Sequence, residues 1–279
     1  MGQHFFRNAQ HTMKQPPYHN TDILITNDDG ILAPGMDVLI ERLRKRYSVL
    51  VVAPQTEVSG CGHAISLDRP LRLAAVPGQE DYYSVDGYTT DCLYVARSGL
   101  MEGTLPRLVV SGMNLGPNLG EDVTYSGTVA GAMEAAVWGV PGVAFSSIER
   151  KPEHLDAMAD AAVAIVDRLM GMLDNWPDGG FVNINIPDLP GLGPDDVRVV
   201  PLGRRRYGQG LTCGTDPRGK PYWWIGGKPL GCEGSGSDCA AVETGHISLT
   251  PLHIDWGRGV SGDQWQNLFA TGTPDKKAM

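Results

Sequence analysis

Short apolar runs and amphipathic segments alternate along most of this chain. The first apolar run covers residues 23–26, a segment with helical spacing follows at 34–47, and a second apolar run covers 49–53. Continuous apolar runs of this length are typical of parallel strands that are buried on both faces. A strand, a helix and a strand within about thirty residues predict a βαβ unit with a right-handed crossover.

Further elements continue the alternation. Two short β segments are expected between residues 64 and 85, with a turn at Pro77-Gly78. We expect three more core strands at 107–111, 142–146 and 181–187, and helices at 90–100, 126–138 and 155–169. The pattern therefore predicts an α/β protein built on a parallel sheet.

The sequence pattern changes from about Pro190 onward, where glycine-rich turns and short alternating strands replace the long helices and strands. Four of the six tryptophans lie in this part, and Trp223-Trp224 falls in a predicted hairpin. We expect a flexible N-terminal extension (1–20), an α/β core (21–190) and a β-rich hairpin and tail (191–279). Because exposed aromatic hairpins often pack against a second subunit, we expect a homo-oligomer.

Composition and charge limit the possible partners. The chain has 279 residues, 42% of them hydrophobic, and a net charge of −9 without a long basic block, which argues against binding to duplex nucleic acid. No apolar run approaches the ~20 residues that span a membrane, and residues 1–20 lack the apolar core of a signal peptide. Five cysteines, an odd number without a CxxC pair, argue against a disulfide framework or a zinc site and favour a cytoplasmic location.

Two adjacent carboxylates, Asp28 and Asp29, stand where the first predicted strand ends, and Gly30 permits a sharp exit. Ligands of open α/β sheets bind beyond the carboxyl ends of the strands. Side-by-side carboxylates repel each other unless a positive charge lies between them, and oxygen donors suit hard cations such as Mg²⁺ or Mn²⁺. The alternative is that both residues only cap the next helix.

Three further segments are expected at the same edge of the sheet. A loop at 55–63, after the second strand, carries Ser59, whose hydroxyl is either a metal ligand or part of a turn. A glycine-rich loop at 112–120 carries Asn114 and Asn118. Ser126, Gly127 and Thr128 open a helix whose free N–H groups and hydroxyls can bind phosphate without lysine, and Ser126 also suits the N-cap.

Other nucleotide-binding patterns are missing. The chain has no Walker loop and no GxGxxG after its first strand, so we do not expect a dinucleotide cofactor. The consecutive arginines at 204–206 suit a solvated face, although one guanidinium can reach an anionic substrate.

Together these segments resemble the survival protein family called SurE. The resemblance covers residues 22 to about 256 in order. The matching motifs are Ile25 to Ile31 with Ala33-Pro34-Gly35, Val51 to Pro54 with Ser59-Gly60, Val110 to Gly116 with Asn118-Leu119-Gly120, Asp122-Val123, Tyr125 to Val129, Ala132-Met133-Glu134, Asn183 to Pro187, and Ser248 to Asp255. The chain departs from the residues that are common in this family at Val58, Tyr88-Thr89 and His246. None of these differences removes a proposed metal ligand.

The resemblance implies a metal-dependent 5′/3′-nucleotidase that also acts on short polyphosphate. It implies a Rossmann-like, parallel three-layer core with a β-hairpin and tail appendage, and a homodimer or tetramer with exchanged C-terminal tails. It also implies one divalent cation per subunit, Mg²⁺ or Mn²⁺, on the ligands Asp28, Asp29, Ser59 and Asn114.

For this reaction we expect the cation to polarise a phosphate oxygen and to activate a water molecule. Asn118 and the Ser126-Gly127-Thr128 segment would hold the phosphate oxygens. Asp28 is the expected proton acceptor, with His63 as its rival. Two competing classes are a phosphate-ligand sensor without turnover and a metal-dependent glycosyltransferase-like enzyme.

Overall fold

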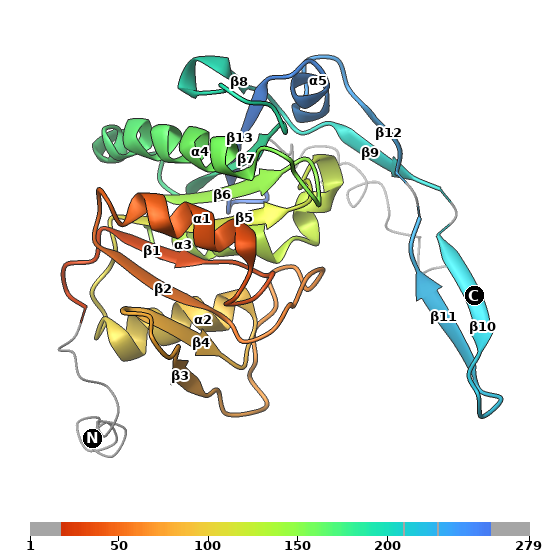
Figure 1. Ribbon diagram of the computed structural model, residues 1–279, viewed down its shortest axis with the longest axis horizontal. Coiled ribbons are helices and arrows are strands. Elements are labelled where there is room, and N and C mark those ends of the chain that lie inside the picture. The colour runs from red at the N-terminus through yellow and green to blue at the C-terminus, as the bar shows by residue number, and fades with distance from the viewer. Residues whose placement is uncertain (1–17, 209, 228, 258–279) are drawn as a thin grey trace, which may run out of the picture.

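The computed structural model describes residues 18–208, 210–227 and 229–257, and its centre is a mixed sheet of nine strands (Figure 1). The apolar runs form strands where the sequence predicts them, because each run is buried on both faces. In chain order the strands of this sheet are β1 (Ile23–Thr26), β2 (Val49–Pro54), β3 (Leu73–Ala75), β4 (Tyr82–Val85), β5 (Leu108–Leu115), β6 (Gly142–Ser147), β7 (Gly180–Ile186), β8 (Val197–Val199) and β13 (Ile247–His253).

Helices cover both faces of this sheet, which confirms the predicted three-layer α/β fold. They are α1 (Pro34–Leu43), α2 (Thr89–Val95), α3 (Gly127–Val137), α4 (Leu155–Met170) and the short α5 (Asp238–Glu243), and a π-helical turn, η2 (Ala96–Leu100), continues α2. The first helix begins with proline, whose missing N–H is not needed there. In the part of the chain that the structure covers, no helix has the length and apolarity needed to cross a bilayer.

The order of the strands is β3-β4-β2-β1-β5-β6-β7-β13-β8. The six strands from β4 to β7 in this order run parallel. Strand β3 pairs antiparallel with β4, and β13 pairs antiparallel with β7 but parallel with β8. The chain moves from β1 to β2 on one side and later returns to β5 on the other side of β1. The switch in direction lies between β1 and β5, where ligands of open α/β sheets bind.

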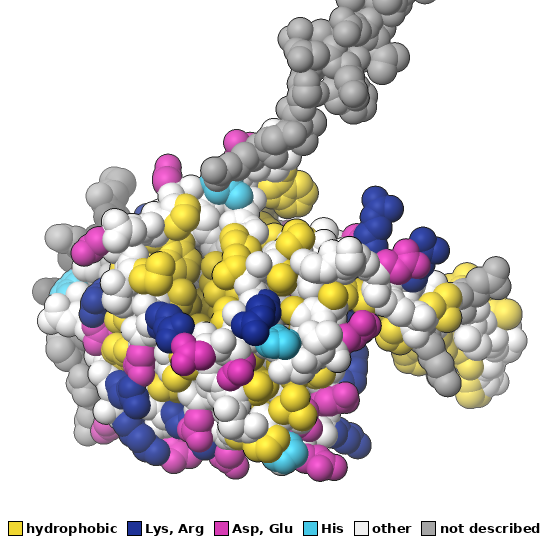
Figure 2. Space-filling model, turned by 90° about the horizontal axis from the view of Figure 1, so that it is seen from above, with side chains coloured by type: hydrophobic (Ala, Val, Ile, Leu, Met, Phe, Trp, Pro, Cys, Tyr) yellow, Lys and Arg dark blue, Asp and Glu magenta, His cyan; other side chains and the backbone are white. Residues whose placement is uncertain are grey.

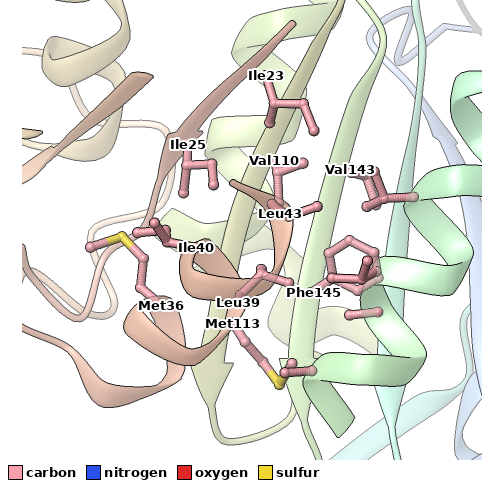
Figure 3. Close-up of a cluster of buried hydrophobic side chains, with 14 of the residues drawn as sticks. Ile23, Ile25, Met36, Leu39, Ile40, Leu43, Val110, Met113, Val143 and Phe145 are labelled. Atoms are coloured by element: carbon pink, nitrogen blue, oxygen red, sulfur yellow. The ribbon is translucent and has the colours of Figure 1, made fainter. Parts of the chain in front are cut away.

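Alternation along the strands builds two apolar layers. Ile23 and Ile25 of β1 face α1 and α4, whereas Leu24 faces the opposite layer with Leu93 of α2. Figure 3 shows the first layer, where β1, β5 and β6 contribute side chains that meet α1. Its labelled members are Ile23, Ile25, Met36, Leu39, Ile40, Leu43, Val110, Met113, Val143 and Phe145.

A long β arm projects from the body of the molecule (Figure 1). It consists of β9 (Arg204–Tyr207) paired with β12 (Pro229–Glu233), and of β10 (Leu211–Thr215) paired with β11 (Pro221–Ile225). The predicted hairpin is therefore confirmed, and Trp223 and Trp224 on β11 are 63% and 69% exposed. The sheet itself does not stop at the expected boundary near residue 190, because β8 and β13 extend it.

The base of the arm is tied to the body in two ways. The buried Asp238 carboxylate accepts hydrogen bonds from the backbone of Gly120 (2.9 Å) and Gly203 (2.7 Å). Cys232 of β12 packs against Cys239 of α5, with 5.6 Å between their Cα atoms. The fold brings these two cysteines together through the turn between β12 and α5, a proximity that their spacing in the sequence does not reveal.

Two expectations lie largely outside the described residues. The flexible N-terminal extension was predicted for 1–20, and the description begins at Tyr18. The tail expected to be exchanged between subunits includes residues 258–279, which the structure does not describe.

Candidate active site

The carboxyl ends of β1, β2 and β5 and the start of α3 meet around a cavity of about 630 Å³. Six of the eight residues predicted from the sequence line it, namely Asp28, Asp29, Ser59, Asn114, Asn118 and Ser126. The other two, Gly127 and Thr128, lie directly behind Asp28. The structure therefore brings the whole predicted set to one place.

A larger cavity, of about 750 Å³, lies between the end of α4 and strands β7, β8 and β13. Figure 2 shows hydrophobic side chains gathered on this face. Its lining includes Phe181, Leu249 and Leu252 but neither aspartate nor glutamate. The smaller cavity with the paired carboxylates is therefore the better candidate for chemistry on a charged substrate.

Asp28 is held by the start of α3. Its carboxylate accepts a hydrogen bond from the Gly127 backbone N–H (3.0 Å) and another from the Thr128 hydroxyl (2.5 Å), and only 4% of the residue is exposed. Burial raises the pKa of Asp28, whereas these two hydrogen bonds act in the opposite direction. The positive end of α3 thus faces a carboxylate that burial destabilises.

Asp29 points to the neighbouring strand, where the Leu115 backbone N–H donates to its Oδ2 atom (3.3 Å). Burial and, next, the charge of Asp28 raise the pKa of Asp29 to about 6. Two adjacent carboxylates at this edge therefore repel each other, and a cation between them would relieve that repulsion.

The loop that carries Ser59 is fixed at several points. The Val58 backbone N–H donates to the Asp28 carbonyl (2.8 Å), and the Gly62 N–H donates to the Tyr125 carbonyl (2.9 Å). The Ser59 hydroxyl donates to Glu57 (3.0 Å). These contacts keep the Ser59 side chain at the cavity.

His63, the expected rival as proton acceptor, lies at the end of this loop. Its Nε2 atom pairs with the buried carboxylate of Glu134 on α3 (2.8 Å), which also accepts a hydrogen bond from the Trp138 ring (2.7 Å). His63 does not line the cavity. Its contact with Glu134 instead anchors the loop to α3.

The two asparagines of the β5 loop are held differently. Asn114 donates through Nδ2 to the Gly116 carbonyl (2.6 Å), and this leaves its amide oxygen as the atom suited to a metal. Asn118 donates to Ser146 (2.7 Å), and its carbonyl accepts from Asn183 and Asn185 of β7. The sequence motif at 183–187 thus acts by fixing the backbone of Asn118.

At the start of α3, the Ser126 side chain accepts a hydrogen bond from the Val129 N–H (3.1 Å), which confirms the predicted N-cap. Thr128 is completely buried, and its hydroxyl donates to Asp28. The Gly127 N–H donates to the same carboxylate. In the structure both groups thus donate to Asp28. The phosphate contacts that the sequence suggested for Gly127 and Thr128 stay a prediction.

The donor set fits a hard divalent cation. Two carboxylates, an amide oxygen and a hydroxyl line one cavity, and their chemistry suits Mg²⁺ or Mn²⁺ rather than a soft metal. No group of three or more His, Cys, Asp or Glu side chains suited to a metal occurs among residues 18–208, 210–227 and 229–257. The pair Asp28 and Asp29 would therefore need the neutral ligands Ser59 and Asn114.

Sequence reasoning missed part of the lining of this cavity. The additional charged or aromatic residues there are Glu57, Asp122, Tyr125, Arg150 and Tyr207. Arg205 lines it as well, and the consecutive arginines had suggested that one guanidinium reaches the site. Its charge is engaged, because it pairs with Asp122 (2.6 Å) and lies over the Tyr207 ring.

Fold and site together define a class: an α/β protein with paired carboxylates and a helix N-terminus at the switch point of its sheet. Comparison with known proteins is specific. The family described as Survival protein SurE matches residues 23–209. The 5′-nucleotidase SurE of Nitrosococcus oceani is 42% identical over 245 residues, which are 87% of this chain and 95% of that protein.

A relative from Aquifex aeolicus, also named 5′-nucleotidase SurE, is 39% identical over 83% of this chain and 92% of its own length. The crystal structure of the SurE protein from Aquifex aeolicus is similar with a TM-score of 0.73 and 36% identity, covering 88% of this chain and 97% of that chain. The chain therefore belongs to the SurE family, as its motifs indicated.

Proposed function

We propose that this protein is a metal-dependent phosphomonoesterase that hydrolyses nucleoside 5′- and 3′-monophosphates and also short polyphosphate. The observation that carries the proposal is the pair of adjacent carboxylates, the buried Asp28 and the half-buried Asp29, beside the N-terminus of α3 in one cavity. Relatives about 40% identical over most of the chain bear the name 5′-nucleotidase SurE, which favours hydrolysis over the sensor and the glycosyltransferase alternatives.

Asp28, Asp29, Ser59 and Asn114 are the proposed ligands of one Mg²⁺ or Mn²⁺ per subunit. When bound, the cation supplies positive charge to the phosphoryl group and electrophilic polarisation of one of its oxygens. Phosphoryl transfer needs mainly positioning and charge stabilisation, so a site without lysine is sufficient for this chemistry.

The protein groups have separate proposed roles. Asn118 and Ser126 line the cavity and are placed to orient phosphate oxygens. Thr128, with its hydroxyl on Asp28, acts as a positioning residue for that carboxylate. Asp28 is the proposed acceptor of the proton that the attacking water loses.

A phosphate-release screen over nucleoside 5′- and 3′-monophosphates with Mg²⁺ or Mn²⁺ tests the proposal. We expect release from the nucleotides that EDTA abolishes and added metal restores. Nucleotide binding without release would identify a sensor, and transfer of sugar from a nucleotide sugar would identify a glycosyltransferase. Either result would refute the proposed reaction.

The affinity for metal is expected to fall as the pH drops through about 6. Burial and the Asp28 charge raise the pKa of Asp29 from 3.8 to about 6, so below that pH a proton competes with the cation. One competing proton weakens binding about tenfold per pH unit. Titration calorimetry with Mn²⁺ at several pH values measures this, and Asp29→Asn should remove the pH dependence that Asp29 causes.

The raised pKa of Asp29 also affects the stability of the metal-free fold. Here a rise in pH is unfavourable, whereas for metal binding it is favourable. Between the ordinary pKa of 3.8 and about 6, the folded protein retains a proton on Asp29 that the unfolded chain has lost. The contribution of Asp29 to folding therefore becomes less favourable as the pH rises through this window. Thermal unfolding in EDTA should show this loss in the wild type and a smaller one in Asp29→Asn.

Thr128→Val is expected to weaken metal binding more than phosphate binding. The substitution keeps the volume but removes the hydrogen bond that lowers the pKa of Asp28. Loss of a hydrogen bond to a charged group costs about 1.5–3 kcal/mol, or roughly 10- to 100-fold in affinity. Separate titrations with Mn²⁺ and inorganic phosphate distinguish this result from the direct phosphate contact that the sequence suggested.

We also propose that the protein is a homodimer or a tetramer, and that the exposed arm lies at the interface. Trp223, Trp224 and Ile225 of β11 are all more than 60% exposed, and an apolar patch of this kind usually marks an interface. Light scattering should give a mass of at least twice the monomer for the wild type and a smaller mass for Trp223→Ser/Trp224→Ser. A monomeric wild type would refute assembly, whereas an unchanged double variant would exclude only these tryptophans.

A further inference from the structure

Arg150 stands at the candidate site on a turn that leaves the carboxyl end of β6. The Ser147 hydroxyl closes this turn, because it accepts a hydrogen bond from the Glu149 N–H (3.0 Å) and donates to the Glu149 carbonyl (2.8 Å). The Ile148 N–H bonds to the Ile186 carbonyl of β7 (3.1 Å). The backbone before Arg150 is therefore fixed, and its exposed side chain lines the cavity of Asp28 and Asp29.

The stem of this arginine lies beside Gly116. A Cβ atom on Gly116 would lie 3.5 Å from Cγ and 3.9 Å from Nε of Arg150. The same point lies 3.8 Å from Nδ2 of Asn114, a proposed metal ligand. Arg150 thus packs along the glycine-rich loop on the side that Asn114 also occupies.

Arg150 supplies a positive charge to a cavity whose lining is mainly acidic. Four carboxylates line it, on Asp28, Asp29, Glu57 and Asp122, against the guanidinium groups of Arg150 and Arg205. Arg205 pairs with Asp122 in a largely buried contact. Within the described ranges Arg150 has no carboxylate at ion-pair distance, so it is the cation left for a dianionic ligand.

We propose that Arg150 is a substrate-binding residue that holds the phosphoryl oxygens of the phosphate monoester in this cavity. This inference rests on the proposed function and assigns a specificity role within it. A guanidinium presents a planar fork of N–H donors that matches two phosphate oxygens, which an ammonium group does not. Arg150 then favours ligands that carry a phosphate dianion, whatever group the phosphate is attached to.

The test compares Arg150→Gln and Arg150→Lys with Arg206→Gln, a matched control whose guanidinium pairs with the exposed Glu233 and does not line the cavity. Inorganic phosphate is titrated into each Mn²⁺-loaded protein, and KM and kcat are measured for a nucleoside monophosphate and for p-nitrophenyl phosphate. We expect phosphate affinity to fall about 10- to 100-fold in Arg150→Gln, the range for a lost hydrogen bond to a charged group, with partial recovery in Arg150→Lys.

KM should rise by a similar factor for both esters, whereas Mn²⁺ affinity and the control variant should not change. Unchanged phosphate binding in Arg150→Gln would overturn the inference. So would a loss confined to the nucleotide, because Arg150 would then contact the nucleoside. If the wild type releases phosphate from no ester, the proposed function fails, and the phosphate titration alone still decides the role of Arg150.

Discussion

Asp28→Asn is expected to abolish turnover, with a loss on the order of a thousandfold or more, the size typical of removing a key electrostatic group. Asparagine keeps the shape of the side chain but removes the charge that the proposed cation needs. It also places an amide group where both carboxylate oxygens now accept hydrogen bonds, from Gly127 and Thr128. Phosphate release at saturating Mn²⁺ measures the effect.

Thermal unfolding of the same variant separates chemistry from folding. Burial raises the pKa of Asp28, so the ionised form is costly in the metal-free fold, and Asp28→Asn should unfold close to the wild type in EDTA. Asp174→Asn, at an exposed position away from the cavity, is the control. A wild-type rate in Asp28→Asn would refute the metal assignment, and a rate rescued by excess metal would limit Asp28 to a ligand role.

Gly127→Ala should also lower turnover strongly, in this case through sterics alone. A Cβ atom on Gly127 would lie 2.7 Å from Cβ and 2.9 Å from Oδ2 of Asp28, so strand β1 or helix α3 must shift. Overpacking of this kind costs about 1–3 kcal/mol of stability. A displacement of the carboxylate by about 1 Å costs roughly a hundredfold in rate, and phosphate release together with thermal unfolding measures both losses.

Gly99→Ala provides the matched control for that variant. Gly99 lies in the turn that continues α2, and the nearest atom to an added Cβ is 3.9 Å away, on Val95. Its activity should equal that of the wild type, and its stability should not fall. Full activity in Gly127→Ala would show that Asp28 tolerates the displacement and that its contact with α3 is not needed.

The core could be predicted from the sequence because its strands are buried on both faces. Runs such as 23–26 and 49–53 contain almost no polar residue. A short run of this kind is typical of a parallel strand that helices cover on both faces. Strand β13 was harder to predict. It contains the buried polar residues Ser248 and Thr250, lies antiparallel to β7, and follows the arm in sequence, so its pattern suggested an appendage.

The site could be predicted where its chemistry is contiguous in sequence. Asp28 and Asp29 are adjacent, and Ser126 to Thr128 open one helix, so local patterns revealed them. Arg150 follows a strand in a polar stretch that is typical of an ordinary turn, and only the folded arrangement of β5 and β6 brings it to the cavity beside Gly116. Whether Thr128 faces a phosphate or Asp28 depends on the position of α3 relative to β1, which no local pattern contains.

The hydrogen bonds of the paired carboxylates have a consequence for the order of folding. Asp28 meets Gly127 and Thr128 across 99 and 100 positions of chain, and Asp29 meets Leu115 across 86. The pocket therefore exists only after β1, β5 and α3 have assembled, and closing such distant contacts is slow. A cation that needs all of these segments would bind last and slow unfolding without speeding folding, because its ligands are not yet together at the rate-limiting step.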